Sequence, residues 1–160
     1  MSRATATAEQ AVAAWMSDIA AQSDGNAHYG IEQAVRTYGH VQLPAQALAV
    51  ADQLVASTGN DSDPSKKAFA EYMKIKALHW NGRDTEAITL ASTFNQAYVS
   101  STRARIQDIR ISAQLYASAL HLRVGNPLIG DSILAVIETA HPNQYRDWVR
   151  FYRNIQNPSQ

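Results

Sequence analysis

The chain has 160 residues, 46% of them hydrophobic, which is enough for one ordinary domain with a buried core. Basic and acidic residues balance at 14 each, and this balance argues against a general nucleic-acid binder, which normally carries a basic excess. The chain holds no cysteine, so disulfides, thiolate metal sites and cysteine nucleophiles are excluded.

Apolar residues recur at helical spacing along the whole chain, and no segment shows the clean alternation of a strand. We therefore expect an all-α protein. Helices are predicted over about 6–22, 27–39 and 102–124, and from Pro44, Pro64, Asp84, Pro127 and Pro142 onward. Asp63-Pro64 and Asn126-Pro127 have the composition of a helix cap followed by a first-turn proline.

A glycine turn recurs between these helices. Gly82 and Gly125 each follow an apolar-periodic segment, and each precedes a small residue by five positions. A weaker copy starts at Gln42. The small residues of the three copies are Ala47, Ala87 and Gly130, spaced 40 and 43 residues apart. Such self-similarity is typical of stacked helix pairs, and we expect these small residues to be buried where helices cross.

The segment from Ala68 to Ser100 resembles a tetratricopeptide repeat, on the turn Gly82-Arg83 and the following Glu86-Ala87. The resemblance implies about three stacked antiparallel helix pairs, with additional N- and C-terminal helices. The whole would form one helical-repeat domain over 1–160, with 1–5 and 157–160 disordered. The spacing exceeds the family period of 34, and Glu71 and Lys74 stand where the family has large apolar residues. Another helical bundle is the alternative.

Tetratricopeptide proteins hold a peptide in a concave groove lined by the first helix of each pair. The resemblance therefore implies a partner-binding surface on the first helices of this chain. Its expected members are Tyr29, Arg36, Phe69, Tyr72, Lys76, His79 and Leu115. Aromatic anchors mixed with cations suit an extended peptide. The structural alternative is that Phe69, Tyr72 and Leu115 fill the core between helices.

Five histidines invite a catalytic or metal hypothesis, but none has an HExxH or similar ligand spacing. Three of them, His40, His79 and His121, lie near the ends of predicted first helices, where a histidine can bond free carbonyls. We expect no enzyme activity, no cofactor and no metal. No apolar run reaches the length of a membrane span, and no secretory signal is evident.

These observations predict a cytoplasmic adaptor or chaperone whose partner is another protein or peptide, without nucleic-acid or membrane binding. Two alternatives remain: a subunit that forms a homo-oligomer through its terminal helices, or a regulatory domain that senses a ligand. The last predicted helix bears on the first alternative. Its apolar stripe holds Tyr145, Trp148, Val149 and Tyr152, widened by Phe151 and Ile155, beside three arginines. Burial in the core is the expected role of this stripe, and contact with another chain is the alternative.

Overall fold

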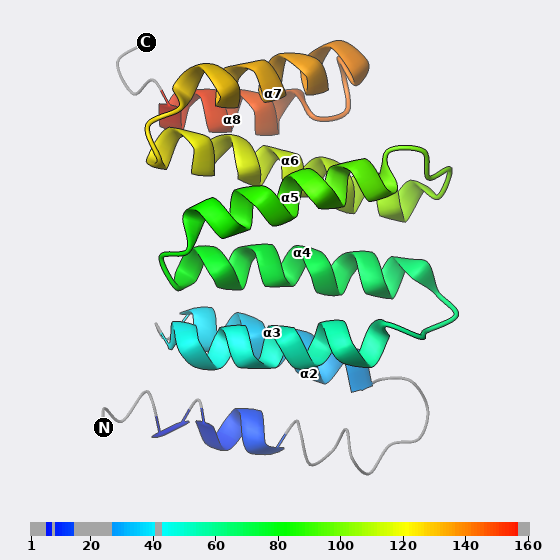
Figure 1. The fold of residues 1–160 in the computed structure, drawn as a ribbon, viewed down its shortest axis with the longest axis vertical. Coiled ribbons are helices and arrows are strands. Elements are labelled where there is room, and N and C mark those ends of the chain that lie inside the picture. The colour runs from blue at the N-terminus through cyan, green and yellow to red at the C-terminus, as the bar shows by residue number, and fades with distance from the viewer. Residues whose placement is uncertain (1–5, 8, 15–26, 41–42, 157–160) are drawn as a thin grey trace. The chain divides into compact units, whose positions relative to one another are not determined.

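The structure is a computed structural model that describes residues 6–7, 9–14, 27–40 and 43–156. Within these ranges every regular element is a helix, which confirms the all-α prediction (Figure 1). The helices are α2 (Ala27–His40), α3 (Pro44–Thr58), α4 (Pro64–Trp80), α5 (Asp84–Tyr98), α6 (Ala104–Arg123), α7 (Pro127–Ala140) and α8 (Arg146–Gln156).

The chain divides into two compact units, unit 1 (Met1–Arg83) and unit 2 (Asp84–Gln160). The expected single domain over 1–160 stays a prediction. The expected disorder of 1–5 and 157–160 lies outside the described residues.

Unit 1 is built from α2, α3 and α4, each of which contacts the other two. Its core is rich in alanine, and such small side chains let helix backbones approach closely. Residues 9–14 are also helical, and Val12 belongs to this core. The buried members are Val12, Ala34, Val35, Tyr38, Ala47, Val50, Ala51, Leu54, Ala70, Met73 and Ala77. In α2 and α3 the buried residues recur at helical spacing, as the apolar periodicity of the sequence predicted.

Unit 2 is organised around α6, which contacts α5, α7 and α8. The helix α7 also contacts α8. The core between the last three helices contains Ile111, Leu115, Leu134, Ile137 and Val149. The side chain of Val136 in α7 is 64% exposed, because Leu134 and Ile137 occupy the buried side of that helix.

The recurring glycine turn has the same geometry in both units. Gly82 and Gly125 have positive φ values of 71° and 82°, which glycine adopts without a Cβ penalty. In each turn, the amide after the glycine donates to a carbonyl five residues earlier, as in a Schellman motif. These bonds join Arg83 to Leu78 at 3.0 Å and Asn126 to His121 at 2.7 Å. The repeat detected in the sequence is therefore a repeated helix C-cap.

The small residues that follow these turns are buried. Ala47 and Ala87 are 0% exposed, and Gly130 is buried in α7. Their predicted burial is thus confirmed.

The observed starts of the helices agree less closely with the starts predicted from the sequence. Asp63 caps α4 as predicted, because its carboxylate accepts the amide of Ser65 at 3.0 Å. Asn126 holds the N-cap position of α7, but its side chain makes no capping bond. The last helix starts at Arg146 and not at Pro142, since residues 142–144 form a turn that precedes it.

Candidate functional site

One side of α4 carries a line of aromatic and cationic side chains. Tyr72, Lys76 and Trp80 follow one another at intervals of one helical turn, and all three are half-buried. The ammonium of Lys76 lies 5.4 Å from the ring centroid of Tyr72 and 5.9 Å from that of Trp80. Both distances are within the range of cation–π attraction. We call these three residues the α4 stripe.

The stripe is braced against α2 at Gly39. A Cβ at this position would lie 2.5 Å from Cζ3 of Trp80, a separation that real Cβ atoms do not show. Only glycine leaves room for the indole there, so the ring packs directly on the backbone of α2. Trp80 also packs on the core of unit 1. The indole of Trp80 is therefore held in place by unit 1 itself.

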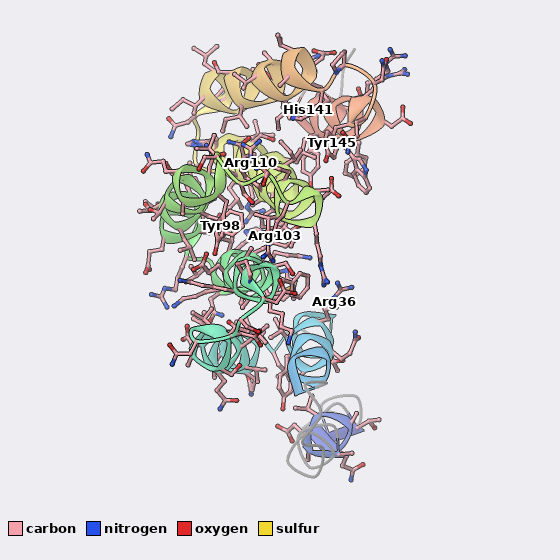
Figure 2. All side chains as sticks on the ribbon, turned by 90° about the vertical axis from the view of Figure 1, so that its right-hand side faces the viewer. Arg36, Tyr98, Arg103, Arg110, His141 and Tyr145 are labelled. Atoms are coloured by element: carbon pink, nitrogen blue, oxygen red, sulfur yellow. The ribbon has the colours of Figure 1, made fainter. Side chains whose placement is uncertain are left out.

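The other residues predicted for this surface in unit 1 belong to α2 and α4. Arg36 is exposed on α2, one turn before the glycine that receives Trp80 (Figure 2). Phe69 is partly buried and packs against the core, so it serves the structure at least in part. His79 is half-buried in the last turn of α4. Tyr29 belongs to α2, but its side chain lies outside the described residues.

Leu115 does not join this group. Its side chain is 4% exposed and belongs to the core of unit 2, between Ile111 and the apolar residues of α7. The helix α6 buries residues around most of its circumference, including Ile109 and Ala113, so an apolar residue there had little chance of facing solvent. The structure thus corrects Leu115 from a contact residue to a core residue.

Trp80 was not among the predicted contact residues, although it is central to the stripe. The surface expected from the resemblance to a repeat family ended at His79, the residue before Trp80. The signal was nevertheless present: positions 72, 76 and 80 are each four residues apart and so lie on one side of a helix.

The resemblance to a tetratricopeptide repeat led us to expect an apolar residue at position 74, where the chain has Lys74. Lys74 lies on another side of α4, where its ammonium bonds to the carboxylate of Asp52 on α3 at 2.7 Å. The two side chains are partly exposed, so this pair contributes at most about 1 kcal/mol. Lys74 thus takes part in a surface ion pair and not in an apolar contact.

Unit 2 contains a separate polar cluster around Asp108, which accepts a hydrogen bond from the Tyr145 hydroxyl. Burial, followed by this hydrogen bond and the carboxylate charge, raises the pKa of Tyr145 to about 12. Arg110 lies nearby on α6, and its positive charge offsets part of the rise (Figure 2). Arg110 itself donates to Asn95 at 2.7 Å and to Gln107 at 2.8 Å. These bonds tie α5, α6 and the segment before α8 together, a structural role.

The histidine side chains that the structure describes do not group as metal ligands. Among the residues that the structure describes, no three histidine, aspartate or glutamate side chains group as ligands. His40, His79 and His121 lie at helix ends as predicted. Burial lowers the pKa of His121, and its Nδ1 has no hydrogen-bond partner in the described part of the chain. The predicted bond to a helix carbonyl is therefore not made by that nitrogen.

No protein-family model matches this chain, and neither a curated protein nor a solved structure matches it. Over the described ranges, no helix combines the length and the apolar character that crossing a membrane requires. We therefore infer function from the side chains that the structure describes, beginning with the α4 stripe.

Proposed function

We propose that this chain is a non-enzymatic protein-interaction module, an adaptor or chaperone, that binds a peptide segment of a partner on the α2–α4 face of unit 1. The observation that carries the proposal is the α4 stripe, in which Lys76 lies over the rings of Tyr72 and Trp80. Tyrosine and tryptophan are the residues most enriched among those that dominate binding energy at interfaces.

The arrangement favours binding because the side chains are already ordered. Ordering a mobile side chain on association costs about 0.5–1.5 kcal/mol, and a ring fixed beforehand avoids most of that cost. Trp80 is fixed by Gly39 and the core, and the Lys76 ammonium lies 5.4 Å from the centroid of the Tyr72 ring. Half-burial leaves part of each side chain open to a ligand.

The charges on this face indicate the chemistry of the ligand. Arg36 and Lys76 are both cationic and lie on adjacent helices, α2 and α4. A peptide that combines an apolar or aromatic residue with one or two carboxylates would complement them. The aromatics would supply affinity, and the cations would steer the ligand and set its orientation.

The packing of unit 1 supports a repeat-like architecture for this face. The helix α4 contacts both members of the preceding pair, α2 and α3, as the first helix of a following repeat would. The repeated C-cap at Gly82 and Gly125 agrees with the same proposal.

The test begins with a phage-displayed random peptide library selected on the full chain, followed by calorimetry with the enriched peptides. Tyr72→Ala should weaken binding by about 2 kcal/mol, whereas Tyr72→Phe, which keeps the ring, should bind nearly as the parent does. Lys76→Glu should mainly slow association, and Lys67→Glu, a change at an exposed lysine on another side of α4, should have little effect.

Circular dichroism must show native helix content in each variant, since Tyr72 also contributes to packing. If folded Tyr72→Ala and Lys76→Glu variants bind the selected peptides as tightly as the parent, the α2–α4 face is not the site.

A further inference from the structure

The side-chain amide of Asn81 joins the end of α4 to the start of α3. Its Nδ2 group donates one hydrogen bond to the carbonyl of Pro44, the first residue of α3, and another at 3.1 Å to the carbonyl of Ala77, one turn earlier on α4. An amide nitrogen has two N–H groups, and these two carbonyls use both of them. We call this arrangement the Asn81 clamp. It comes directly after Trp80, the last residue of α4 and of the α4 stripe.

The clamp depends on an amide because both groups that face the side chain are hydrogen-bond acceptors. An ionised carboxylate has only acceptor oxygens, so an aspartate at position 81 would lose both hydrogen bonds. It would also set a negative charge against two carbonyl oxygens. Asn81 is half-buried, so water can replace the lost bonds only in part. Exchange of the amide nitrogen for a carboxylate oxygen would therefore open the clamp.

Asn81 is followed by Gly82, and asparagine deamidates most readily when glycine follows it. Glycine has no side chain that could shield its own backbone nitrogen, so this nitrogen can reach the side chain of the asparagine. Asn81-Gly82 is the only Asn-Gly dipeptide in the sequence. The second glycine turn has no such pair, because Gly125 follows Val124, and Asn126 precedes a proline, which has no N–H.

The folded structure keeps the two reacting groups occupied. Deamidation requires the Gly82 nitrogen to attack Cγ of Asn81, but the N–H of Gly82 donates to the carbonyl of His79 at 2.8 Å. The two hydrogen bonds of the clamp hold the Asn81 side chain against the preceding turn of α4 and against α3. The next amide, that of Arg83, bonds to the carbonyl of Leu78 and closes the turn. The reaction therefore requires the end of α4 to open first.

We propose that Asn81 is a modification site of this protein, which deamidates when the end of α4 opens and then can no longer close the clamp. The backbone nitrogen of Gly82 forms a bond to Cγ of Asn81 and gives its proton to solvent, and Nδ2 leaves as ammonia. Water then hydrolyses the resulting succinimide ring. Cleavage of the ring at Cγ gives aspartate, and cleavage at the backbone carbonyl gives isoaspartate. One water is consumed and one ammonia is released, without oxidation or reduction.

The modification makes a transient opening permanent. Opening at the end of a helix is a local event of low free energy, and an unmodified chain closes again. An aspartate at position 81 repels the two carbonyls, and an isoaspartate also lengthens the backbone within the turn. Either product leaves Trp80 at the end of a helix that the clamp no longer ties to α3. This chemistry does not depend on whether the α2–α4 face binds a peptide.

Mass spectrometry with peptide mapping tests this inference on the full chain, incubated in mildly alkaline buffer with and without urea. Asn81 should be the first asparagine to show the mass gain of an amide that has become an acid. Its rate should rise at least about tenfold in urea, because a closed site reacts only through the fraction of chains that are open. Equal rates with and without urea would overturn the inference, as would earlier deamidation at another asparagine.

Two glycine variants identify the nitrogen that attacks. In urea, Gly82→Ala should slow deamidation at Asn81 several-fold, because the added methyl group shields the backbone nitrogen. Gly125→Ala is the matched control, since it makes the same change at the other glycine of positive φ and should leave the rate unchanged. If Gly82→Ala deamidates in urea as fast as the parent, the Gly82 nitrogen does not carry the reaction and the inference fails.

Asn81→Asp reproduces one product and tests its effect on the clamp. Its melting temperature should lie about 3–8 °C below that of the parent, because two acceptors lose their donor. The matched control is Asn126→Asp, at an N-cap where the asparagine side chain makes no capping bond. A carboxylate is favourable there, so this variant should be at least as stable as the parent. An Asn81→Asp chain that melts with the parent would overturn the inference.

Discussion

Two aromatic surfaces of this molecule, the α4 stripe of unit 1 and the open side of α8 in unit 2, use similar residues in different ways. Trp80 packs on Gly39 and the core, and Lys76 joins it to Tyr72. Trp148 and Phe151 are mostly exposed and meet each other. Within the described ranges, all the exposed large hydrophobic side chains belong to unit 2: Val99, Val124, Leu128, Ile129, Val136, Trp148 and Phe151.

The two surfaces differ in how much ordering the binding of a ligand would require. A ring that its own unit already holds in place loses little conformational freedom on binding. Even a small ligand can therefore bind it without a large ordering cost. A pair of rings open to solvent gains most from a second large surface that removes both from water. The fixed indole of the α4 stripe agrees with the proposed peptide ligand.

The largest expected effect comes from filling the space at Gly39. Gly39→Val should force the indole of Trp80 out of its place and lower the free energy of unfolding by about 1–3 kcal/mol, as overpacking does. Urea denaturation measures the loss of stability. A red shift of the tryptophan emission would report that Trp80 has become more exposed to solvent, as Trp148 already is.

Gly59→Val is the matched control, because a Cβ there meets only backbone carbonyls at ordinary distances of 3.5 and 3.9 Å. Equal stability losses in the two variants would mean that Gly39 does not brace the stripe.

A smaller effect is expected at the repeated turn, where the two units should behave alike. Gly82→Ala and Gly125→Ala both place a Cβ in open space but at positive φ, so the cost is one of backbone conformation alone. Each should lower the free energy of unfolding by about 1 kcal/mol. Denaturant titration of both variants checks this, and a neutral result at one position would show that the two turns are not energetically equivalent.

The smallest expected effect concerns the covered side of α8 and depends on pH. The pKa of Tyr145 is raised from 10.0 to about 12, so the folded state keeps a proton that the unfolded state releases. Its contribution to stability is complete below pH 10 and is lost as the pH rises toward 12. Between pH 8 and 11, the unfolding free energy of the parent should therefore fall more steeply than that of Tyr145→Phe. Parallel curves would contradict the raised pKa.

The sequence predicted the helices and the recurrent turn because both depend on local signals. Helical spacing, Asp63 as a cap and glycine at Gly82 and Gly125 each act within a few residues. The start of α8 was misplaced because a proline that suits a first turn also suits the turn before a helix, as Pro142 shows.

The candidate site was predicted less well because it depends on tertiary packing. Nothing local distinguishes Leu115, which is core, from an apolar residue on a binding face; only the packing of α7 against α6 decides its role. Likewise, the place of Trp80 depends on the missing Cβ of Gly39, a residue 41 positions earlier on another helix. The exposure of Trp148 and Phe151 follows in the same way from which side of α8 meets the core.

The central claim is that a peptide binds the α2–α4 face. Its most direct test uses the tryptophan fluorescence of the two surfaces. In a Trp15→Phe/Trp148→Phe background Trp80 is the only tryptophan, and a Trp15→Phe background keeps Trp80 and Trp148 together, so that the difference between the two variants reports Trp148. A peptide selected on the full chain is titrated into both at low protein concentration. We predict that the emission of Trp80 shifts on binding while that of Trp148 does not. A response at Trp148, with none at Trp80, would contradict the assignment of peptide binding to the α2–α4 face.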